Sequence, residues 1–388
     1  MTRVTVHEYA AALVPRYRAA GRGEKGRILD EFCGATGMHR KAAIRLLRGV
    51  QGPKAGRRPR KRKYGPEAAE ALRLVWEVGD RMCGKLLVGA VPGLLEALER
   101  HGELRLGATE REALLEMSAA TMDRLLRLAR RAIGRQPRRK STPTTGLKAQ
   151  VPIRTWSEWA GVAPGSLQMD LVLHCGESTE GFYLTTLTAV DVATGWTELQ
   201  AVWGIGKERV GGAVHRVRQK LPFALRELHN DNGSEFLNYT LRSWCLKQKI
   251  GWTRGRGYQK NDQAYVEQKN WLAVRRYIGY GRYTSKEAYQ TMQQLHSLLG
   301  LYSNFFRPVR KVIAKERRGS KVVKRYDRPL TPYQRVLAAG CLSEEDREEL
   351  VSQYLSLNPA SLRRRIENIL RRLWPLASYN VQNQRRAG

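Results

Sequence analysis

Three acidic residues stand in sequence contexts that suit metal-dependent chemistry on phosphate esters. Asp170 interrupts the apolar alternation of SLQMDLVLH, Asp231 follows the strand-like run ALREL, and Glu267 lies in the helical stretch KNDQAYVEQKN. Carboxylate oxygens are ligands for hard divalent cations such as Mg²⁺. Two such ions activate an attacking oxygen and stabilise the leaving oxygen of a phosphodiester. If the two strand ends and the helix converge, the three carboxylates form an all-oxygen metal site of a nuclease or strand-transfer type.

The alternative is that the three acids are ordinary surface charges, as most Asp and Glu side chains are. Their contexts favour the functional interpretation. An Asp between Met169 and Leu171 in an apolar strand is unusual unless its side chain points at a pocket. Asp231 stands directly before Asn232 and Gly233, so that a carboxylate lies beside a flexible turn.

These motifs resemble a known family. The string DNGSEF, with its upstream Asp and with thirty-five residues between Asp231 and Glu267, resembles the catalytic core of the retroviral-integrase-like DDE transposases, in particular their bacterial insertion-sequence branch. KNDQAYVEQKN is similar to the motif around that family's glutamate, and AVDVATGW is similar to its second-strand motif. The resemblance covers residues 165 to 283, about a third of the chain.

The resemblance implies a fold, a reaction and a site. It implies an RNase H-like core that cleaves DNA ends to release 3′ hydroxyls and joins them to target DNA. It implies that Asp170, Asp231 and Glu267 are the catalytic and metal-binding triad, with two Mg²⁺ or Mn²⁺ ions per active site. It also implies an oligomer, at least a dimer on paired DNA ends.

Further contacts with DNA are expected around the glutamate. Lys260, Asn261 and Gln263 precede Glu267 and are expected to hold the DNA end. Retroviral relatives place basic residues one and two helical turns after the glutamate. Here those positions are Trp271 and Val274, which are typical of a core, so the contact is expected to pass to Lys269 or Asn270.

Other polar residues near the triad have simpler interpretations. His174 and His229 are expected to be packed or hydrogen-bonded rather than metal ligands. Asp191, which precedes ATGW, is expected to be a turn residue.

The composition favours a nucleic-acid partner. The 388 residues carry a formal net charge of +33, and 42% are hydrophobic, so that real cores can form. Such an excess of positive charge suits a polyanion, with double-stranded DNA first and a membrane surface second. No apolar run is long enough to span a bilayer, and the N-terminus lacks a signal-peptide core.

The cysteines argue for a reducing compartment. Five of them are scattered along the chain without a CxxC or Cys/His cluster, which favours neither a disulfide framework nor a zinc site. Retroviral integrases carry an N-terminal zinc module, and this chain departs from that pattern. We expect a cytoplasmic, nucleoid-associated bacterial protein.

The N-terminal third is expected to be helical. In residues 1–52, a helix over Glu24–Phe32 is broken by Gly34 and Gly37 and followed by HRKAAIRLLRG, the pattern of a helix-turn-helix. Its second helix is expected to present Arg40, Lys41 and Arg45 to DNA. Residues 67–134 are expected to form a second helical, helix-turn-helix-like module, in which the segment from Thr109 to Ala132 repeats the plan with Ser118 as an N-cap. The alternative for both modules is a plain helical bundle with a solvated basic face.

Two basic linkers separate these modules. Residues 53–66 are expected to form an extended arm that binds phosphates or a minor groove, or otherwise a solvated linker. The basic residues of the arm expected to bind DNA are Arg57, Arg58, Arg60, Lys61, Arg62 and Lys63. Residues 135–164 form the second linker, whose Pro, Thr and basic content argues against a fold of its own.

The pattern changes to α/β from Gly165 onward. SLQMDLVLH, FYLTTLTAVDV and WTELQAVW are three successive strands, and KERVGGAVHRVRQKL is a helix. The strand ALREL, the helix EFLNYTLRSWCLKQK, the strand IGWTRG and the helix of Glu267 follow. This order predicts a mixed sheet covered by helices over residues 165–284.

The C-terminal region, residues 285–388, is expected to be mostly helical, with a basic hairpin around Arg318 and Gly319. The small β-barrel of retroviral integrases is not expected, because no five-strand pattern is present. The last helices are expected to pack on the core or a partner, with Arg363 and its neighbours facing DNA or solvent.

The sequence therefore predicts a DNA transposase. Two alternatives stay open: a catalytically inactive DNA-binding regulator that retains the fold, and a metal-dependent nuclease that cleaves without joining.

Overall fold

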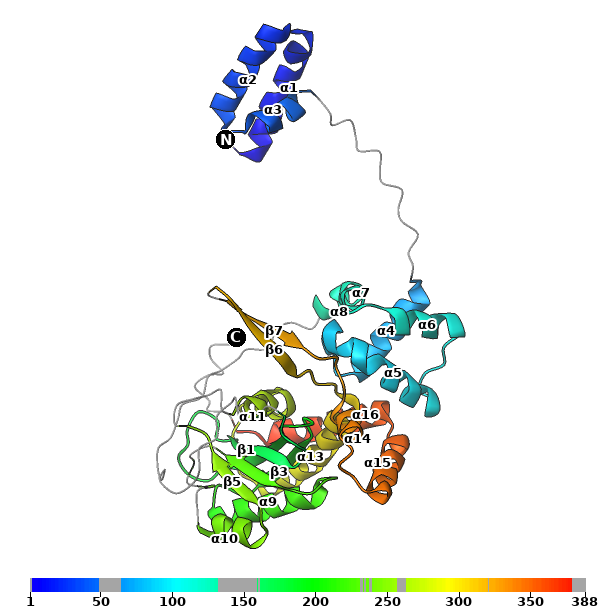
Figure 1. Cartoon of the computed structure of the whole chain (residues 1–388), viewed down its shortest axis with the longest axis vertical. Helices are drawn as coiled ribbons and strands as arrows, with labels where there is room; N and C mark the ends of the chain where they lie inside the picture. Colours follow the sequence, from blue (N-terminus) through cyan, green and yellow to red (C-terminus); the bar gives the residue numbers. More distant parts are fainter. Residues whose placement is uncertain are drawn as a thin grey trace. The chain divides into compact units, whose positions relative to one another are not determined.

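The chain divides into two compact units in a computed structural model, residues 1–63 and 64–388 (Figure 1). The structure describes residues 2–48, 64–131, 159, 161–230, 233, 235–236, 239–256, 263–319 and 321–378. In the described part, no helix has the length and apolar character needed to cross a bilayer.

The first unit contains three helices, α1 (Arg3–Ala19), α2 (Arg22–Thr36) and α3 (Arg40–Leu47). Ile28 and Phe32 of α2 and Leu47 of α3 are buried in their shared core. Gly37 ends α2 in the left-handed conformation, with φ of 69°, which glycine adopts without strain. The expected pair of helices joined by a short turn is confirmed, but Gly34 lies inside α2 and does not break it.

The second unit begins with five helices. They are α4 (Pro66–Val78), α5 (Gly84–Arg100), α6 (Ala108–Glu116), α7 (Ala119–Leu125) and α8 (Arg127–Arg131). Ser118 caps α7, as expected, because its side chain accepts a hydrogen bond from the Thr121 N–H at 3.3 Å.

A five-stranded sheet forms the centre of the second unit. Its strands are β1 (Ser166–Leu173), β2 (Thr185–Asp191), β3 (Thr197–Val202), β4 (Glu227–Asn230) and β5 (Gly251–Arg254). The spatial order is β3-β2-β1-β4-β5. β1, β2 and β3 are antiparallel neighbours, whereas β4 runs parallel to β1 and β5 parallel to β4.

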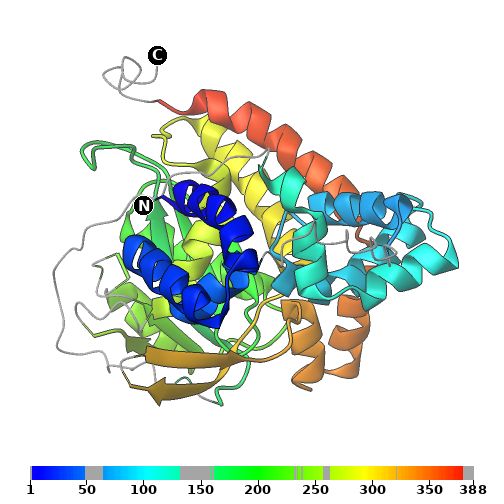
Figure 2. The same cartoon turned by 90° about the horizontal axis from the view of Figure 1, so that it is seen from above.

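Helices cover both faces of this sheet (Figures 1 and 2). On one face, Leu167, Met169 and Leu171 of β1 share a core with α9 (Lys207–Lys220) and α10 (Tyr239–Lys247). The residues that alternate with them in β1 lie on the other face, toward α11 (Ala264–Lys269) and α13 (Lys286–Phe306).

This topology confirms the expected fold class. An antiparallel meander of three strands, extended by two parallel strands through helical crossovers, is the RNase H-like arrangement. Two boundaries differ from the sequence expectation. The strand predicted over ALREL occurs at Glu227–Asn230, because that segment pairs in register with Ser166–Met169. The helix of Glu267 continues as a π-helical segment, Asn270–Arg275, and then as the short α12, Arg276–Ile278.

The C-terminal region is mostly helical, as expected, and also contains the expected hairpin. After α13 come β6 (Val312–Arg318), β7 (Lys321–Tyr326), α14 (Pro332–Ala338), α15 (Glu344–Ser356), α16 (Pro359–Leu373) and a 3₁₀ turn, Trp374–Leu376.

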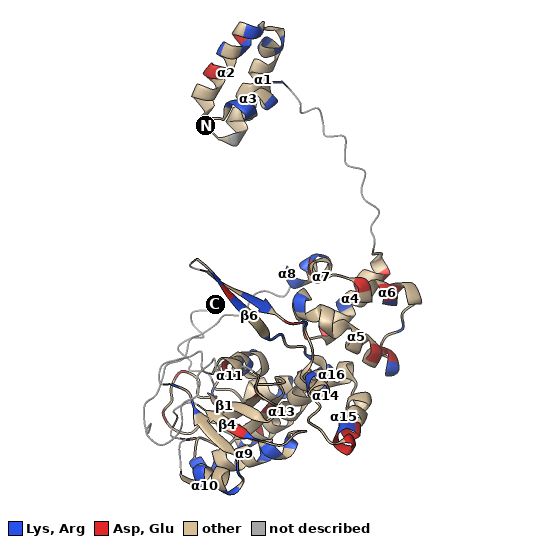
Figure 3. Ribbon diagram, viewed as in Figure 1, with Lys and Arg blue, Asp and Glu red and all other residues tan. Residues whose placement is uncertain are grey.

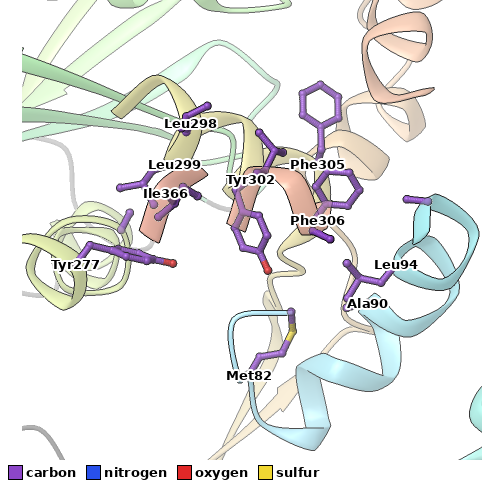
Figure 4. Close-up of a cluster of buried hydrophobic side chains, with 14 of the residues drawn as sticks. Met82, Ala90, Leu94, Tyr277, Leu298, Leu299, Tyr302, Phe305, Phe306 and Ile366 are labelled. Carbon is purple, nitrogen blue, oxygen red and sulfur yellow. The ribbon is translucent and has the colours of Figure 1, made fainter. Parts of the chain in front are cut away.

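The C-terminal helices pack against the helices that precede the sheet. Figure 4 shows Tyr302, Phe305 and Phe306 of α13 beside Ala90 and Leu94 of α5, and all five side chains are buried in one cluster. Apolar burial of this kind is the main favourable term in folding. The cluster therefore joins α4–α8 to the sheet-containing core.

A buried ion cluster reinforces this junction. Asp80, in the loop after α4, accepts hydrogen bonds from Arg276 at 2.7 Å, Arg307 at 2.7 Å and the Tyr277 hydroxyl at 2.8 Å. Arg363 of α16 also pairs with Asp80, at 3.1 Å. The expectation that Arg363 faces DNA or solvent was therefore wrong, because its guanidinium is engaged by a buried carboxylate.

Candidate active site

The candidate site is organised by one face of β1. Gln168 and Asp170 are two residues apart in the strand, so they project from the same face, opposite to Met169. That face is the one toward α11, where Glu267 lies. The Asp170 carboxylate thus leaves the apolar row of β1 and lies on the face toward the helix.

Gln168 holds the start of the helix that carries Glu267. Its side-chain carbonyl Oε1 accepts hydrogen bonds from the N–H groups of Tyr265 at 3.2 Å and Val266 at 3.3 Å. These are first-turn amides, which have no partner within the helix itself. The fully buried Gln168 therefore caps α11 from β1 and sets the position of Glu267 relative to the strand.

Asn270 holds the carboxylate of Asp170. The Asn270 Nδ2 donates to Asp170 Oδ2 at 2.5 Å, and the Leu171 N–H donates to Asp170 Oδ1 at 2.8 Å. Asn270 stands three residues after Glu267, and helical residues three apart share a face. In the described part of the chain, Asn270 Oδ1 is buried and accepts no hydrogen bond. The pattern gave Asn270 as an alternative DNA contact, and its role beside Asp170 was missed.

The π-helical segment determines which residue after Asn270 next lies on the face of the helix toward β1. Arg275 lies five residues after Asn270, one π turn further, and donates to the Leu173 carbonyl at 2.7 Å at the end of β1. The helix is thus joined to β1 at three successive points. Val274 is fully buried, as expected for a core residue, whereas Trp271 is only half-buried.

The second acid of the predicted triad lies outside the described residues. β4 ends at Asn230, which pairs in register with Met169, the neighbour of Asp170. Asp231 is the next residue in the sequence. The Asn230 side chain accepts a hydrogen bond from Trp252 Nε1 of β5 at 2.7 Å, which fixes the end of the strand.

Asp170 of β1 thus meets Asn270, and Glu267 lies on the same helix three residues before Asn270. Glu267 is exposed and Asp170 is half-buried, so both carboxylates are accessible. Among the described residues, no three His, Cys, Asp or Glu side chains gather closely enough to hold a metal ion. The oxygen donors present nonetheless fit a hard cation in chemical type, since they are carboxylates and an amide oxygen without a hydrogen-bond donor.

The residues predicted to contact DNA fall into three groups. Arg40, Lys41 and Arg45 are exposed on α3, and Arg40 pairs with Asp30 of α2. Gln263 and Lys269 are buried, so neither side chain presents a group to DNA in this conformation. The others lie outside the described residues: Arg57, Arg58, Arg60, Lys61, Arg62, Lys63, Lys260 and Asn261.

Lys269 is unusual among these. Its side chain is only 7% exposed, and burial together with the charge of Arg307 lowers its pKa to about 7. Burial disfavours the charged form of an amine. The Lys269 amine therefore lies in the interior of the protein and is easier to deprotonate than a surface lysine.

The histidines and Asp191 behave as the simpler interpretations expected. His174 Nε2 lies 2.8 Å from Thr186 Oγ1, and His229 Nδ1 lies 3.0 Å from Thr253 Oγ1. Asp191 is buried and accepts hydrogen bonds from the N–H groups of Gly165 at 2.8 Å and Thr194 at 2.7 Å. Asp191 is thus a turn residue, and burial raises the pKa of its carboxyl group.

Comparisons with solved structures give the following similarities. The catalytic core domain of BIV integrase is 20% identical, with a TM-score of 0.30, and the match covers 45% of this chain and 95% of that chain. The HTLV-2 integrase catalytic core domain, in a dimeric complex with magnesium, is 16% identical, with a TM-score of 0.25, and the match covers 30% of this chain and 72% of that chain.

No protein-family model matches the sequence. Among curated proteins, the uncharacterized protein y4rM of Sinorhizobium fredii (strain NBRC 101917 / NGR234) is 42% identical over 341 residues. The alignment spans 88% of this chain and 97% of that protein. The chain therefore belongs to the same family as y4rM of Sinorhizobium fredii.

Proposed function

We propose that the chain is a metal-dependent DNA transposase. It binds the ends of a mobile element, cleaves them to release 3′ hydroxyls and joins those hydroxyls to target DNA. The observation that carries the proposal is the hydrogen bond between Asp170 and Asn270, because it joins the strand acid to the helix of Glu267 across the face of an RNase H-like sheet.

The proposed site consists of Asp170, Asp231 and Glu267. Bound there, two Mg²⁺ or Mn²⁺ ions would supply charge neutralisation at the phosphate oxygens. The chain's own residues set the geometry: Asn270 orients the Asp170 carboxylate, and Gln168 fixes the first turn of α11. Water or a DNA 3′ hydroxyl is the nucleophile, so no side-chain nucleophile is needed.

The net charge of +33 supports a DNA substrate. The exposed face of α3 supports specific recognition, since a second helix after a short turn is the element that enters the major groove in helix-turn-helix proteins.

The triad variants test the proposal. We expect Asp170→Asn, Asp231→Asn and Glu267→Gln each to reduce joining of a pre-cut 3′ end to plasmid DNA by at least about 100-fold in Mg²⁺. A carboxamide keeps the shape of the side chain but loses the charge that offsets a cation. Glu208→Gln, an exposed acid in the first turn of α9, is the control and should leave activity unchanged.

The alternatives have their own outcomes. A regulator without activity would show no nicking of end DNA by the wild-type chain in Mg²⁺ or Mn²⁺. A plain nuclease would cleave but would not join pre-cut ends. Joining by the wild-type chain in excess chelator would overturn the metal mechanism.

Concerted joining of two ends requires more than one active site. We therefore propose an oligomer, at least a dimer, on paired ends. Sedimentation of the complex with paired ends should give two or more chains, and a single chain per pair would contradict the proposal.

A further inference from the structure

The hairpin formed by β6 and β7 is an exposed β-ribbon with a basic surface. In the described part of the hairpin, the side chains from Ile313 to Arg317 and from Val322 to Tyr326 are all exposed. These described side chains are not covered by another element on either face, and Figure 1 shows the ribbon projecting away from the sheet of the second unit. A two-stranded hairpin without a packed face is marginal in water, so such a feature needs a reason.

The base of the ribbon is firmly held. Backbone hydrogen bonds of 2.8 and 3.2 Å join Val309 and Leu330 on either side of it. Asp327 accepts from the Lys311 N–H at 2.7 Å and from Arg335 of α14 at 2.6 Å. The Lys311 ammonium also donates to the Ala193 carbonyl in the turn between β2 and β3. The ribbon therefore has a defined direction with respect to the core.

Positive charges are concentrated on one face of the ribbon, where their mutual repulsion disfavours the pairing of the two strands. Lys315 and Lys324 are directly opposite each other across the two strands, and Arg317 projects from the same face, two residues beyond Lys315. Like charges at directly opposed positions destabilise a strand pair. Consistent with this repulsion, burial and the neighbouring Lys324 charge lower the pKa of Lys315. Figure 3 shows several segments of the ribbon in the colour of Lys and Arg and one, at Glu316 in sequence, in the colour of the acids.

Apolar side chains accompany these charges. Ile313 is 64% exposed and Val322 is 56% exposed. At the base of the ribbon, the Arg310 guanidinium lies 4.8 Å from the ring centroid of Tyr326. Basic groups that alternate with apolar ones suit a surface with phosphates beside sugars and base edges.

We propose that the β6–β7 ribbon docks in a groove of double-stranded DNA through Lys315, Arg317 and Lys324. The major groove, about 12 Å wide, admits a two-stranded ribbon whose strands lie about 5 Å apart. β6 has seven residues, so the ribbon extends for about 23 Å, longer than the groove is deep. The proposal rests on the proposed function for the identity of the polyanion. It adds a DNA contact outside the N-terminal unit, on an element anchored beside the catalytic sheet.

A salt-dependence measurement on the full chain tests the ribbon. Lys315→Gln, Arg317→Gln and Lys324→Gln together should weaken binding to duplex DNA by at least about tenfold, measured by fluorescence anisotropy in excess chelator. The slope of log K against log[salt] should fall by about 2 to 3, since each lost phosphate contact contributes about 0.9. The matched control is Lys207→Gln, Arg216→Gln and Lys247→Gln on α9 and α10, which removes the same charge from other exposed positions and should change affinity by no more than about twofold.

A crosslinking measurement gives an independent check. A photoreactive residue at Val322 should crosslink to duplex DNA. Crosslinking to a second copy of the chain or to anionic vesicles in place of DNA would overturn the proposal, and so would an unchanged affinity and salt slope in the triple variant. Because binding is measured without metal, these results are separate from the joining assay. If the triad variants lose joining while the ribbon variant binds DNA like the wild type, the proposed function stands and the ribbon is not a DNA contact.

Discussion

Asn270 and Asp170 lie one hundred residues apart in the sequence, and their side chains are joined by a hydrogen bond of 2.5 Å. A donor to a carboxylate makes a stronger hydrogen bond than a neutral pair does, and it fixes the direction in which the second oxygen points. Asn270 therefore acts as a positioning residue for the strand acid, on the helix that also carries Glu267.

Replacing Asn270 should impair the reaction without loss of DNA binding. We expect Asn270→Leu to lower the rate of joining by about 10- to 100-fold, because the Asp170 carboxylate loses its orientation. Asn270→Gln should restore part of the rate. Single-turnover kinetics at saturating DNA measure the joining rate of each variant separately from its affinity for DNA. Equal joining rates for Asn270→Leu and the wild type would show that Asn270 does not position Asp170 for the reaction.

The cap that Gln168 provides should be detectable in the first turn of α11. Gln168→Met keeps the length but removes the acceptor, which leaves the Tyr265 and Val266 amides unpaired at a typical cost of about 1–3 kcal/mol for such a group. Hydrogen exchange at these amides should become faster, and joining should fall. Gln219→Met, at an exposed position of α9, is the control for loss of an amide. Unchanged exchange in Gln168→Met would contradict the capping role.

The buried charge of Asp80 should be important for stability. It faces three arginines, and Asp80→Asn would leave them without a negative partner at a typical cost of about 3 kcal/mol or more. Asparagine tolerates the left-handed backbone at this position, where φ is 54°, so the change removes charge alone. Urea unfolding measures the difference in free energy. Glu344→Gln removes the partner of Arg347 on the surface, and its effect should stay below about 1 kcal/mol.

The buried carboxyl group of Glu198 should make the stability of the folded state depend on pH. It is buried in β3 beside the Trp196 indole N–H, at 2.9 Å, and burial raises its pKa from 4.5 to about 7. Between these two values the folded state holds a proton that the unfolded state has lost, so stability falls as pH rises from 4.5 to 7 and stays low above it. Glu198→Gln resembles the protonated form. Its stability should equal that of the wild type below pH 4.5 and exceed it by about 3 kcal/mol at pH 8, since each unit of pKa difference corresponds to about 1.4 kcal/mol.

Comparing unfolding midpoints of the two proteins across this range separates the effect of Glu198 from the other titrating groups. A constant difference at all pH values would contradict a shifted carboxyl.

The exposed residues of α3 should determine which DNA sequence is bound. We expect Lys41→Ala and Arg45→Ala to reduce the preference for element ends over unrelated DNA by about tenfold, since base-edge contacts carry sequence information. Arg18→Ala, an exposed position on α1, is the control. Competition binding with end and non-end duplexes measures the ratio. An equal loss of affinity for both duplexes would show that α3 contacts only phosphates.

Local pattern was sufficient to predict the sheet and the polar exception in its first strand. Alternation along β1 identified the row of Leu167, Met169 and Leu171 and the polar exception at Asp170, because strand periodicity is a property of neighbouring residues. The turn at Gly37, the cap at Ser118 and the hairpin at Arg318 were likewise predictable from short-range chemistry.

The tertiary structure decided every feature that depends on distant residues. Gln168 and Asn270 are ordinary polar residues in sequence, and only the packing of α11 on β1 makes one a helix cap and the other a partner of Asp170. Lys269 looked like a surface cation, but its side chain is buried in the folded chain, and this burial together with the charge of Arg307 lowers its pKa to about 7. Arg363 was expected to face DNA or solvent, but it pairs with Asp80, which lies in a loop far earlier in the chain. Burial and ion pairing are consequences of how the elements pack, and periodicity within one element cannot specify them.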